Sequence, residues 1–130
     1  MAKNKKVNKP TEAELEVLQI LWIHGPSTVR FVHEQLFSKK NVGYTTTLKI
    51  MQIMAEKKMV RRNMDSRIHI YSPVLKQEET QNLLLEKFLN STFSGSAHKL
   101  VLQALGNHKT SKEELEQIKS LIKNLEGDRK

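Results

Sequence analysis

The segment that most restricts how this chain can fold is residues 43–73, GYTTTLKIMQIMAEKKMVRRNMDSRIHIYSP. A helix beginning at Thr45 is predicted there, because apolar residues recur every three or four positions and would share one face. That inner face is formed by Thr47, Ile50, Met51 and Met54. Two short β-strands, residues 60–64 and 68–72, are predicted next, and Pro73 ends the second because proline lacks a donor for the ladder.

Two further helices are predicted before this segment. Thr11 and Glu14 form a capping box that starts the first helix, and Gly25-Pro26 ends it. Ser27 or Thr28 caps the second. The apolar stripes are Leu15, Leu18 and Trp22 in the first helix and Val29, Val32 and Leu36 in the second. Three helices followed by a hairpin make a winged helix-turn-helix, so the predicted fold class is mainly α with a small β-hairpin wing.

The C-terminal part of the chain has a different pattern, that of three amphipathic helices. They are predicted over residues 77–90, over residues 97–105, and after a second capping box at Ser111 and Glu114. We therefore expect a winged-helix domain over residues 1–75, with residues 1–9 as a flexible basic arm, and a three-helix dimerisation region over residues 76–130.

The apolar stripes of the C-terminal helices are expected to pack on another copy of the chain. Three helices in so short a segment bury little area alone, and isolated helices of this length are marginal in water. Packing back on the first domain is the alternative that the pattern leaves open. The residues expected at the dimer contact are Leu84, Phe88, Leu100, Val101, Leu115, Ile118, Ile122 and Leu125.

The positive charge is concentrated in the first part of the chain. The formal net charge is +8; residues 1–75 hold 13 Lys/Arg against 6 Asp/Glu, a net +7, and residues 76–130 hold 9 against 8, a net +1. A basic first domain indicates a polyanionic partner, with nucleic acid ahead of an anionic membrane surface.

Several other classes of protein are disfavoured. The chain has no cysteine, which excludes disulfides and thiolate chemistry and suits the cytoplasm. The five histidines form no i, i+4 helical pair and have no acidic cluster beside them, so no metal or other cofactor is expected. No catalytic motif or phosphate-binding glycine loop is present, and we expect no enzyme. No apolar run approaches the roughly 18–20 residues that insertion into a membrane requires.

The expected DNA-binding residues lie on the third helix and on the hairpin. A helix of this kind enters the major groove, where Thr, Lys and Gln side chains meet base edges or phosphates. Leu48 and Ile53 on its outer face either contact thymine methyls or pack on the wing. Arg61 and Arg62 point to opposite faces of their strand, so at most one lies on the DNA. The expected contacts are Thr45, Thr46, Leu48, Lys49, Gln52, Arg62 and Arg67.

With these residues identified, the chain resembles the penicillinase-repressor family of bacterial winged-helix repressors. The resemblance rests on PTEAELEVLQILW (10–22), GPSTVRFVHEQL (25–36), GYTTTLKIMQIMAEKKMVRR (43–62) and IHIYSP (68–73), and more loosely on FLN (88–90) and KLVLQAL (99–105). It implies a homodimer that binds a palindromic DNA operator and blocks transcription, often of β-lactamase or other resistance genes. The family's DNA contacts map onto Thr45, Thr46, Leu48 and Lys49, with Arg67 from the wing.

The chain departs from the family in two features that concern regulation. The copper-responsive branch carries a cysteine pair motif near its C-terminus, and this chain has no cysteine. In the β-lactam-responsive branch a membrane sensor triggers proteolysis of an Asn-Phe bond, and the aligned bond here is Gln103-Ala104. The resemblance thus leaves a sensor-linked protease as a candidate partner. The alternative function is a winged-helix protein-interaction module without specific DNA binding.

Overall fold

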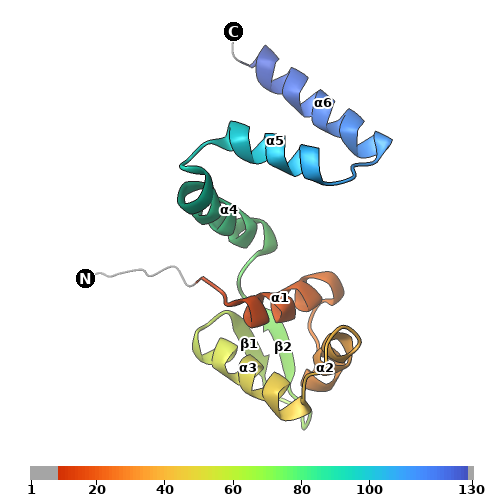
Figure 1. Cartoon of the computed structure of the whole chain (residues 1–130). Coiled ribbons are helices and arrows are strands. Elements are labelled where there is room, and N and C mark those ends of the chain that lie inside the picture. Colours follow the sequence, from red (N-terminus) through yellow and green to blue (C-terminus); the bar gives the residue numbers. More distant parts are fainter. Residues whose placement is uncertain (1–8, 129–130) are drawn as a thin grey trace, which may run out of the picture. The chain divides into compact units, whose positions relative to one another are not determined.

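The computed structural model describes residues 9–128, which form six helices and one two-stranded antiparallel hairpin (Figure 1). In chain order the elements are α1 (Glu12–His24), α2 (Val29–Phe37), α3 (Tyr44–Glu56), β1 (Val60–Asn63), β2 (Ile70–Pro73), α4 (Gln77–Phe93), α5 (Ala97–Asn107) and α6 (Lys112–Gly127). The predicted fold class is confirmed. Apart from Lys9, the predicted basic arm lies outside the described residues.

The chain divides into two compact units, with the division between Leu85 and Glu86, inside α4. The first unit holds the three N-terminal helices, the hairpin and the beginning of α4. The second holds the rest of α4 with α5 and α6. The domain boundary predicted after residue 75 falls in the short connection between β2 and α4, and it stays a prediction.

The hydrophobic core of the first unit lies where α1, α2 and α3 pack around the hairpin. α1 contacts α2, α3 and β2, while α3 contacts α2 and β1. The core residues are Val17, Leu18, Leu21, Val29, Val32, Leu36, Met51, Met54, Met59, Val60 and Tyr71. Each large apolar side chain buried there contributes about 1.5–3 kcal/mol. Trp22 packs at the edge of this core, and its Nε1–H donates to the carbonyl oxygen of Leu75 at 2.9 Å.

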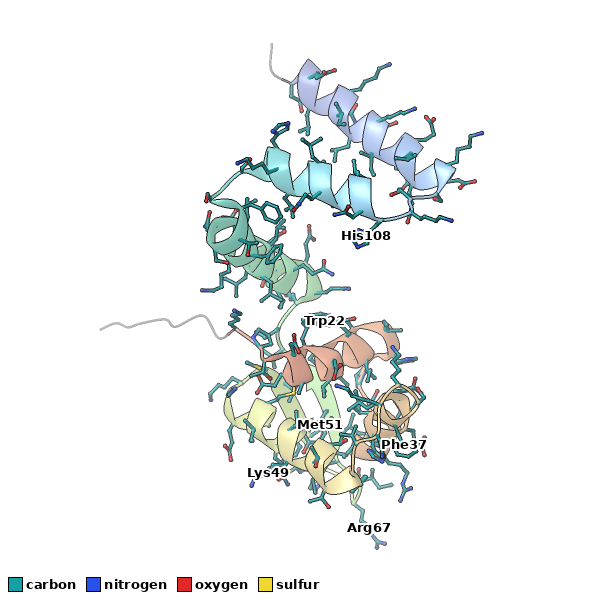
Figure 2. The ribbon with its side chains drawn as sticks, viewed as in Figure 1. Trp22, Phe37, Lys49, Met51, Arg67 and His108 are labelled. Carbon is teal, nitrogen blue, oxygen red and sulfur yellow. The ribbon has the colours of Figure 1, made fainter. Side chains whose placement is uncertain are left out.

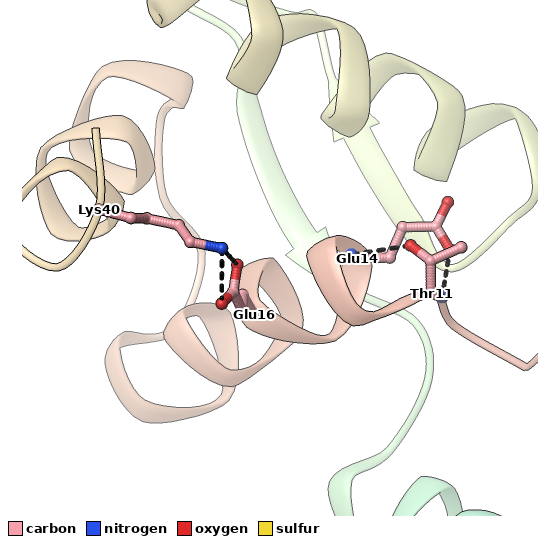
Figure 3. A network of polar contacts seen from close by, with 4 residues as sticks. All are labelled: Thr11, Glu14, Glu16 and Lys40. Carbon is pink, nitrogen blue, oxygen red and sulfur yellow. Dashed lines mark hydrogen bonds and ion pairs between the residues drawn. The ribbon is translucent and has the colours of Figure 1, made fainter. Parts of the chain in front are cut away.

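The start of α1 is held by two kinds of polar contact. The predicted capping box is confirmed: the Thr11 hydroxyl accepts from the Glu14 N–H at 3.1 Å, and a Glu14 carboxylate oxygen accepts from the Thr11 N–H at 3.0 Å (Figure 3). Glu14 also accepts a 2.8 Å contact from Lys57 Nζ, which ties α1 to the end of α3. On the surface, Lys40 pairs with Glu16 at 3.1 Å (Figure 3).

The hairpin is shorter than predicted, and its connecting loop is longer. β1 ends at Asn63, one residue before its predicted end, and β2 begins at Ile70, two residues after its predicted start. The loop between them is held by hydrogen bonds between neighbouring residues. The Asp65 N–H donates to Asn63 Oδ1 at 2.9 Å, and the Ser66 hydroxyl donates to the Ile68 carbonyl at 2.7 Å. Pro73 was expected to end the strand after residue 72, and instead it is the last paired residue, opposite Val60.

Two helix ends also differ from the prediction. α3 begins at Tyr44, not at Thr45, because Gly43 adopts the N-cap position. α4 continues to Phe93, three residues beyond the predicted end. It ends where Ser94 and Gly95 adopt positive φ angles of 51° and 81°, a conformation that a right-handed helix cannot continue.

The helices of the second unit expose most of their apolar side chains. α5 is capped by Ser96, and the predicted capping box of Ser111 and Glu114 starts α6. Neither α5 nor α6 has a buried residue. Within the described residues, no helix combines the length and apolar character that a membrane crossing requires.

Candidate nucleic-acid interface

The helix α3 has a buried face and an exposed face, divided as the sequence predicts. Thr47, Met51 and Met54 are fully buried, which fixes the rotation of the helix about its axis. The side chains predicted on the outer face of α3 are exposed to different degrees. Thr45, Thr46, Lys49 and Gln52 are exposed, while Leu48 and Ile53 are half-buried. Figure 2 shows Lys49 on the outer side of α3 and Arg67 at the tip of the hairpin turn.

A groove separates α3 from the hairpin and extends to the start of α2. We call it the wing groove; its volume is about 580 Å³, and it is lined by Thr28, Val29, Arg30, Tyr44, Leu48, Gln52, Arg62, Arg67, Ile68, His69 and Tyr71. Of the predicted contacts it brings together Leu48, Gln52, Arg62 and Arg67. Thr45, Thr46 and Lys49 do not line it and lie on the neighbouring exposed surface of α3.

The wing groove is strongly positive. Arg30, Arg62 and Arg67 line it, and none of its lining residues is acidic. The N-terminal ends of α2 and α3 also lie at this groove, through Thr28 and Tyr44, and helix N-termini favour anions. Guanidinium groups bind phosphate oxygens bidentately, so the groove has the chemistry of a phosphate-backbone site.

Arg30 is a candidate contact that sequence reasoning missed. It is exposed in the first turn of α2 and lies far along the chain from the other two arginines of the groove. The signal that could have identified it is its position two residues after the Thr28 cap, at the helix end where an anion is expected.

The two neighbouring arginines of β1 differ as strand alternation requires. Arg62 is half-buried, lies opposite Tyr71 and lines the wing groove, whereas Arg61 is exposed and outside it. Leu48 packs against the hydrophobic core and lines the groove with Ile68. The two alternatives for Leu48, a thymine methyl contact or packing on the wing, both stay predictions.

The residues predicted at a dimer contact occupy the second unit and the α4 segment beside it. Phe88, Val101, Leu115, Ile122 and Leu125 are exposed; Leu84, Leu100 and Ile118 are half-buried. The predicted cleavage site, Gln103-Ala104, lies within α5 with both residues exposed. Nowhere in residues 9–128 do three His, Asp or Glu side chains gather closely enough to hold a metal ion.

Three helices, a wing and a basic groove beside an exposed helix start define the class of winged helix-turn-helix proteins. The solution structure of the DNA binding domain of the repressor BlaI has this fold, with a TM-score of 0.51 and 21% identity; the match covers 58% of this chain and 93% of that one. The model of the penicillinase repressor family matches residues 10–124, and the chain belongs to that family.

Individual relatives agree with this assignment. The chain is 33% identical over 93 residues to the transcriptional regulator BlaI of Mycobacterium tuberculosis, covering 70% of this chain and 67% of the relative. It is 26% identical over 119 residues to the penicillinase repressor of Bacillus licheniformis, covering 91% and 92%. The methicillin resistance regulatory protein MecI of Staphylococcus aureus is 20% identical over 119 residues, covering 92% and 97%. The family is one of transcriptional repressors, not of enzymes.

Proposed function

We propose that this protein represses transcription by binding double-stranded operator DNA as a homodimer on a palindromic site. One observation carries the proposal: the exposed start of α3 adjoins a groove lined by three arginines and by no acidic residue. The names of the relatives agree with it, because BlaI and MecI are a transcriptional regulator and a resistance regulatory protein.

In this proposal α3 recognises bases and the wing groove binds phosphates. The hydroxyls of Thr45 and Thr46 donate to base edges or phosphates, Lys49 binds guanine acceptors or a phosphate, and Gln52 pairs with adenine. Leu48 contacts a thymine methyl from the rim of the groove. Arg30, Arg62 and Arg67 bind phosphates and fix the register of the protein without recognising sequence.

The exposed apolar surface of the second unit supports the homodimer. Ile122 and Leu125 are 48% and 50% exposed on α6, and Val101 is 47% exposed on α5. Leaving such side chains in water is unfavourable, and apolar patches of this kind mark interaction sites. A second copy of the same helices would cover them, and a two-fold dimer would match a palindrome.

Selection of bound duplexes from a random DNA library, followed by footprinting, tests the proposal. We expect two protected half-sites separated by one helical turn of about 34–36 Å or a multiple of it. A chain that selects no sequence, protects no site, and binds a protein partner independently of salt would instead be the winged-helix interaction module.

We further propose that the protein acts in the cytoplasm on β-lactamase or resistance-type genes and is inactivated by a sensor-linked protease at Gln103-Ala104. The exposure of both residues supports access, but the bond lies inside α5, so local unfolding must precede cleavage. Intact-mass measurement of the protein from cells before and after β-lactam exposure tests this. Fragments split after residue 103 are expected; an intact chain in induced cells would contradict it.

A further inference from the structure

The imidazole of His33 connects α2 to the first turn of α3. His33 is half-buried, and its Nδ1 lies 3.1 Å from the hydroxyl of Thr47. Thr47 is fully buried, and its hydroxyl also approaches the carbonyl oxygen of Gly43, the N-cap of α3, at 3.4 Å. The hydroxyl of Thr47 can make both bonds at once. It then donates its hydrogen to the Gly43 carbonyl, and its oxygen accepts from an N–H at Nδ1 of His33.

Two aromatic rings hold the same imidazole in place. The ring of Tyr44, the first residue of α3, meets His33 edge to face, with centroids 5.5 Å apart and planes at 80°. Phe37, one turn further along α2, forms a tilted ring pair with His33, with centroids 5.7 Å apart and planes at 37°. An edge-to-face pair such as that with Tyr44 contributes a geometric preference beyond simple burial. The imidazole is thus fixed between the end of α2 and the residue with which α3 begins.

The first turn of α3 begins without a side-chain cap. Gly43 makes no side-chain bond at the N-cap, whereas α1, α2, α5 and α6 are each capped by a Ser or Thr hydroxyl. A glycine N-cap is less stabilising than a Ser or Thr cap by only a few tenths of a kcal/mol, roughly, so what it lacks is a side chain that fixes the helix start to its surroundings. The start of α3 is also where Thr45 and Thr46 are exposed for base contacts.

We infer that His33 is a positioning residue: through Thr47 and Tyr44 it holds the start of α3 in the orientation that sets DNA-sequence preference. The inference rests on the proposed function for the DNA part alone. His33 does not line the wing groove, and its contacts to Thr47 and Tyr44 are both on α3, so its effect on recognition is expected to pass through α3.

Two substitutions separate the hydrogen bond from the ring. His33→Asn places an amide group near the position of Nδ1, while His33→Gln places one near Nε2 and cannot reach Thr47 in the same way. We expect His33→Gln to lower the ratio of affinities for selected over scrambled duplex by about tenfold, and His33→Asn to lower it less than about threefold. Affinity for the scrambled duplex should not change, because phosphate contacts are untouched.

The hydroxyl of Thr47 provides an independent variant. Thr47→Val keeps the buried shape and removes the oxygen, so it should reduce the selected-to-scrambled ratio as His33→Gln does. The double variant should lose no more than Thr47→Val alone, because the bond to His33 is already absent in Thr47→Val. In the full chain, exchange of the Thr47 amide hydrogen, which donates to the Gly43 carbonyl at 3.2 Å, should accelerate by about tenfold in both variants and not in His33→Asn.

The outcomes separate the inference from the function on which it rests. If the wild-type chain selects no DNA sequence, the proposed function fails, and the exchange measurement alone decides whether His33 positions α3. Unchanged exchange of the Thr47 amide in His33→Gln overturns the positioning role. Faster exchange with an unchanged selected-to-scrambled ratio overturns the link to recognition, as does an equal loss of affinity on both duplexes.

Discussion

In the proposed DNA interface, the arginines of the wing groove are expected to meet phosphates, and Thr46 on α3 is expected to meet base edges. Arg30 and Arg67 line the groove, and each should release about one counterion when it binds a phosphate. For Arg30→Ala or Arg67→Ala we expect weaker binding on every duplex, and the slope of log affinity against log salt should flatten by about 0.9. Thr46→Ala should instead keep the slope and relax the sequence preference. Binding titrations at several salt concentrations measure both effects.

Arg61 is the matched control for these variants. It lies on the same strand as Arg62 but is exposed and outside the wing groove. Arg61→Ala removes the same charge from the same hairpin, so it should leave the salt slope close to that of the wild type. If Arg61→Ala flattened the slope as much as Arg67→Ala did, net charge alone would explain the binding, and the groove would have no special role.

Lys58 is in a backbone conformation that favours glycine. Its φ is 65°, immediately after α3, where the Met59 N–H donates to the Met54 carbonyl at 2.9 Å. A left-handed conformation costs an ordinary residue about 1–2 kcal/mol, and the extra unfolded-state entropy of glycine offsets part of that. We expect Lys58→Gly to raise the free energy of unfolding by up to about 1 kcal/mol in urea denaturation. Lys58→Ala, which removes the charge but keeps a Cβ, should change it little; the opposite ranking would contradict the argument.

The structure also indicates which residues local sequence can identify. The buried face of α3 could be predicted because Thr47, Met51 and Met54 follow helical spacing, a property of consecutive residues. His33 could not, because its role depends on how α2 packs against α3, and the sequence marks Arg30 only by its place at a helix start. Contacts between elements remote in sequence leave no periodic pattern, so the wing groove is visible only in the folded structure.

Among the elements, α1 and the end of α3 are joined by an ion pair between a buried carboxylate and a partly exposed lysine, which makes stability depend on pH. The Glu14 side chain is 6% exposed and lies 2.8 Å from Lys57 Nζ. Burial raises the pKa of Glu14, but the hydrogen bond from Lys57, the Thr11 backbone N–H and the charge of Lys57 outweigh it and hold the pKa below its ordinary value. A carboxyl with a lowered pKa stabilises the fold above its unfolded pKa, and that contribution is lost as pH falls through the lowered value.

Glu14→Gln should therefore destabilise the fold at neutral pH by about 1–3 kcal/mol, because a charge-assisted bond to Lys57 is lost while glutamine still completes the capping box. The difference from wild type should shrink in acid, from near the ordinary glutamate pKa of about 4.3 downward. Thermal unfolding at a series of pH values measures it. Glu114→Gln alters the exposed capping box of α6, where the contacts of Glu114 are to Ser111, and should show little change. A difference between wild type and Glu14→Gln that did not vary with pH would exclude the ion pair as its cause.

The ends of elements were harder to predict than their interiors. The hairpin loop is longer than expected because Asn63 and Ser66 bond to nearby backbone groups in place of strand pairing. Pro73 can stand inside the ladder, opposite Val60, because both strands of a two-stranded hairpin are edge strands, where proline is tolerated. The exact residue at which an element ends depends on one or two hydrogen bonds, and residue propensities cannot predict these. The order of the elements follows instead from hydrophobic spacing over whole segments.

For the whole molecule, the distribution of charge and apolar surface supports DNA binding by the first unit and dimerisation by the second, as proposed. The first unit has a packed core and carries the wing groove; the second has amphipathic helices without a buried residue in α5 or α6. A helix pair that exposes its apolar faces is unlike a stable monomeric domain. Dimerisation through these faces would both stabilise the second unit and place two DNA-binding units together.

Ile122→Glu tests this dimer directly. Ile122 is 48% exposed on α6, and a buried carboxylate at a dimer contact would lack a partner. We expect sedimentation to show a monomer at concentrations where the wild type is a dimer, and helicity to fall, because the second unit loses its packing partner. Asn124→Glu introduces the same charge two residues away, at an exposed polar position, and should remain dimeric.

The same pair of variants decides whether dimerisation matters for recognition. A monomer keeps the start of α3 and the wing groove, so Ile122→Glu should still bind a single half-site weakly, with a salt slope about half that of the dimer on the full palindrome. Loss of the dimer therefore removes the gain in affinity that comes from linking two half-sites, which can reach about 10²–10⁴-fold, while leaving each contact intact. If Ile122→Glu were monomeric yet bound the palindrome as tightly as Asn124→Glu, the two-fold arrangement would have no part in operator binding.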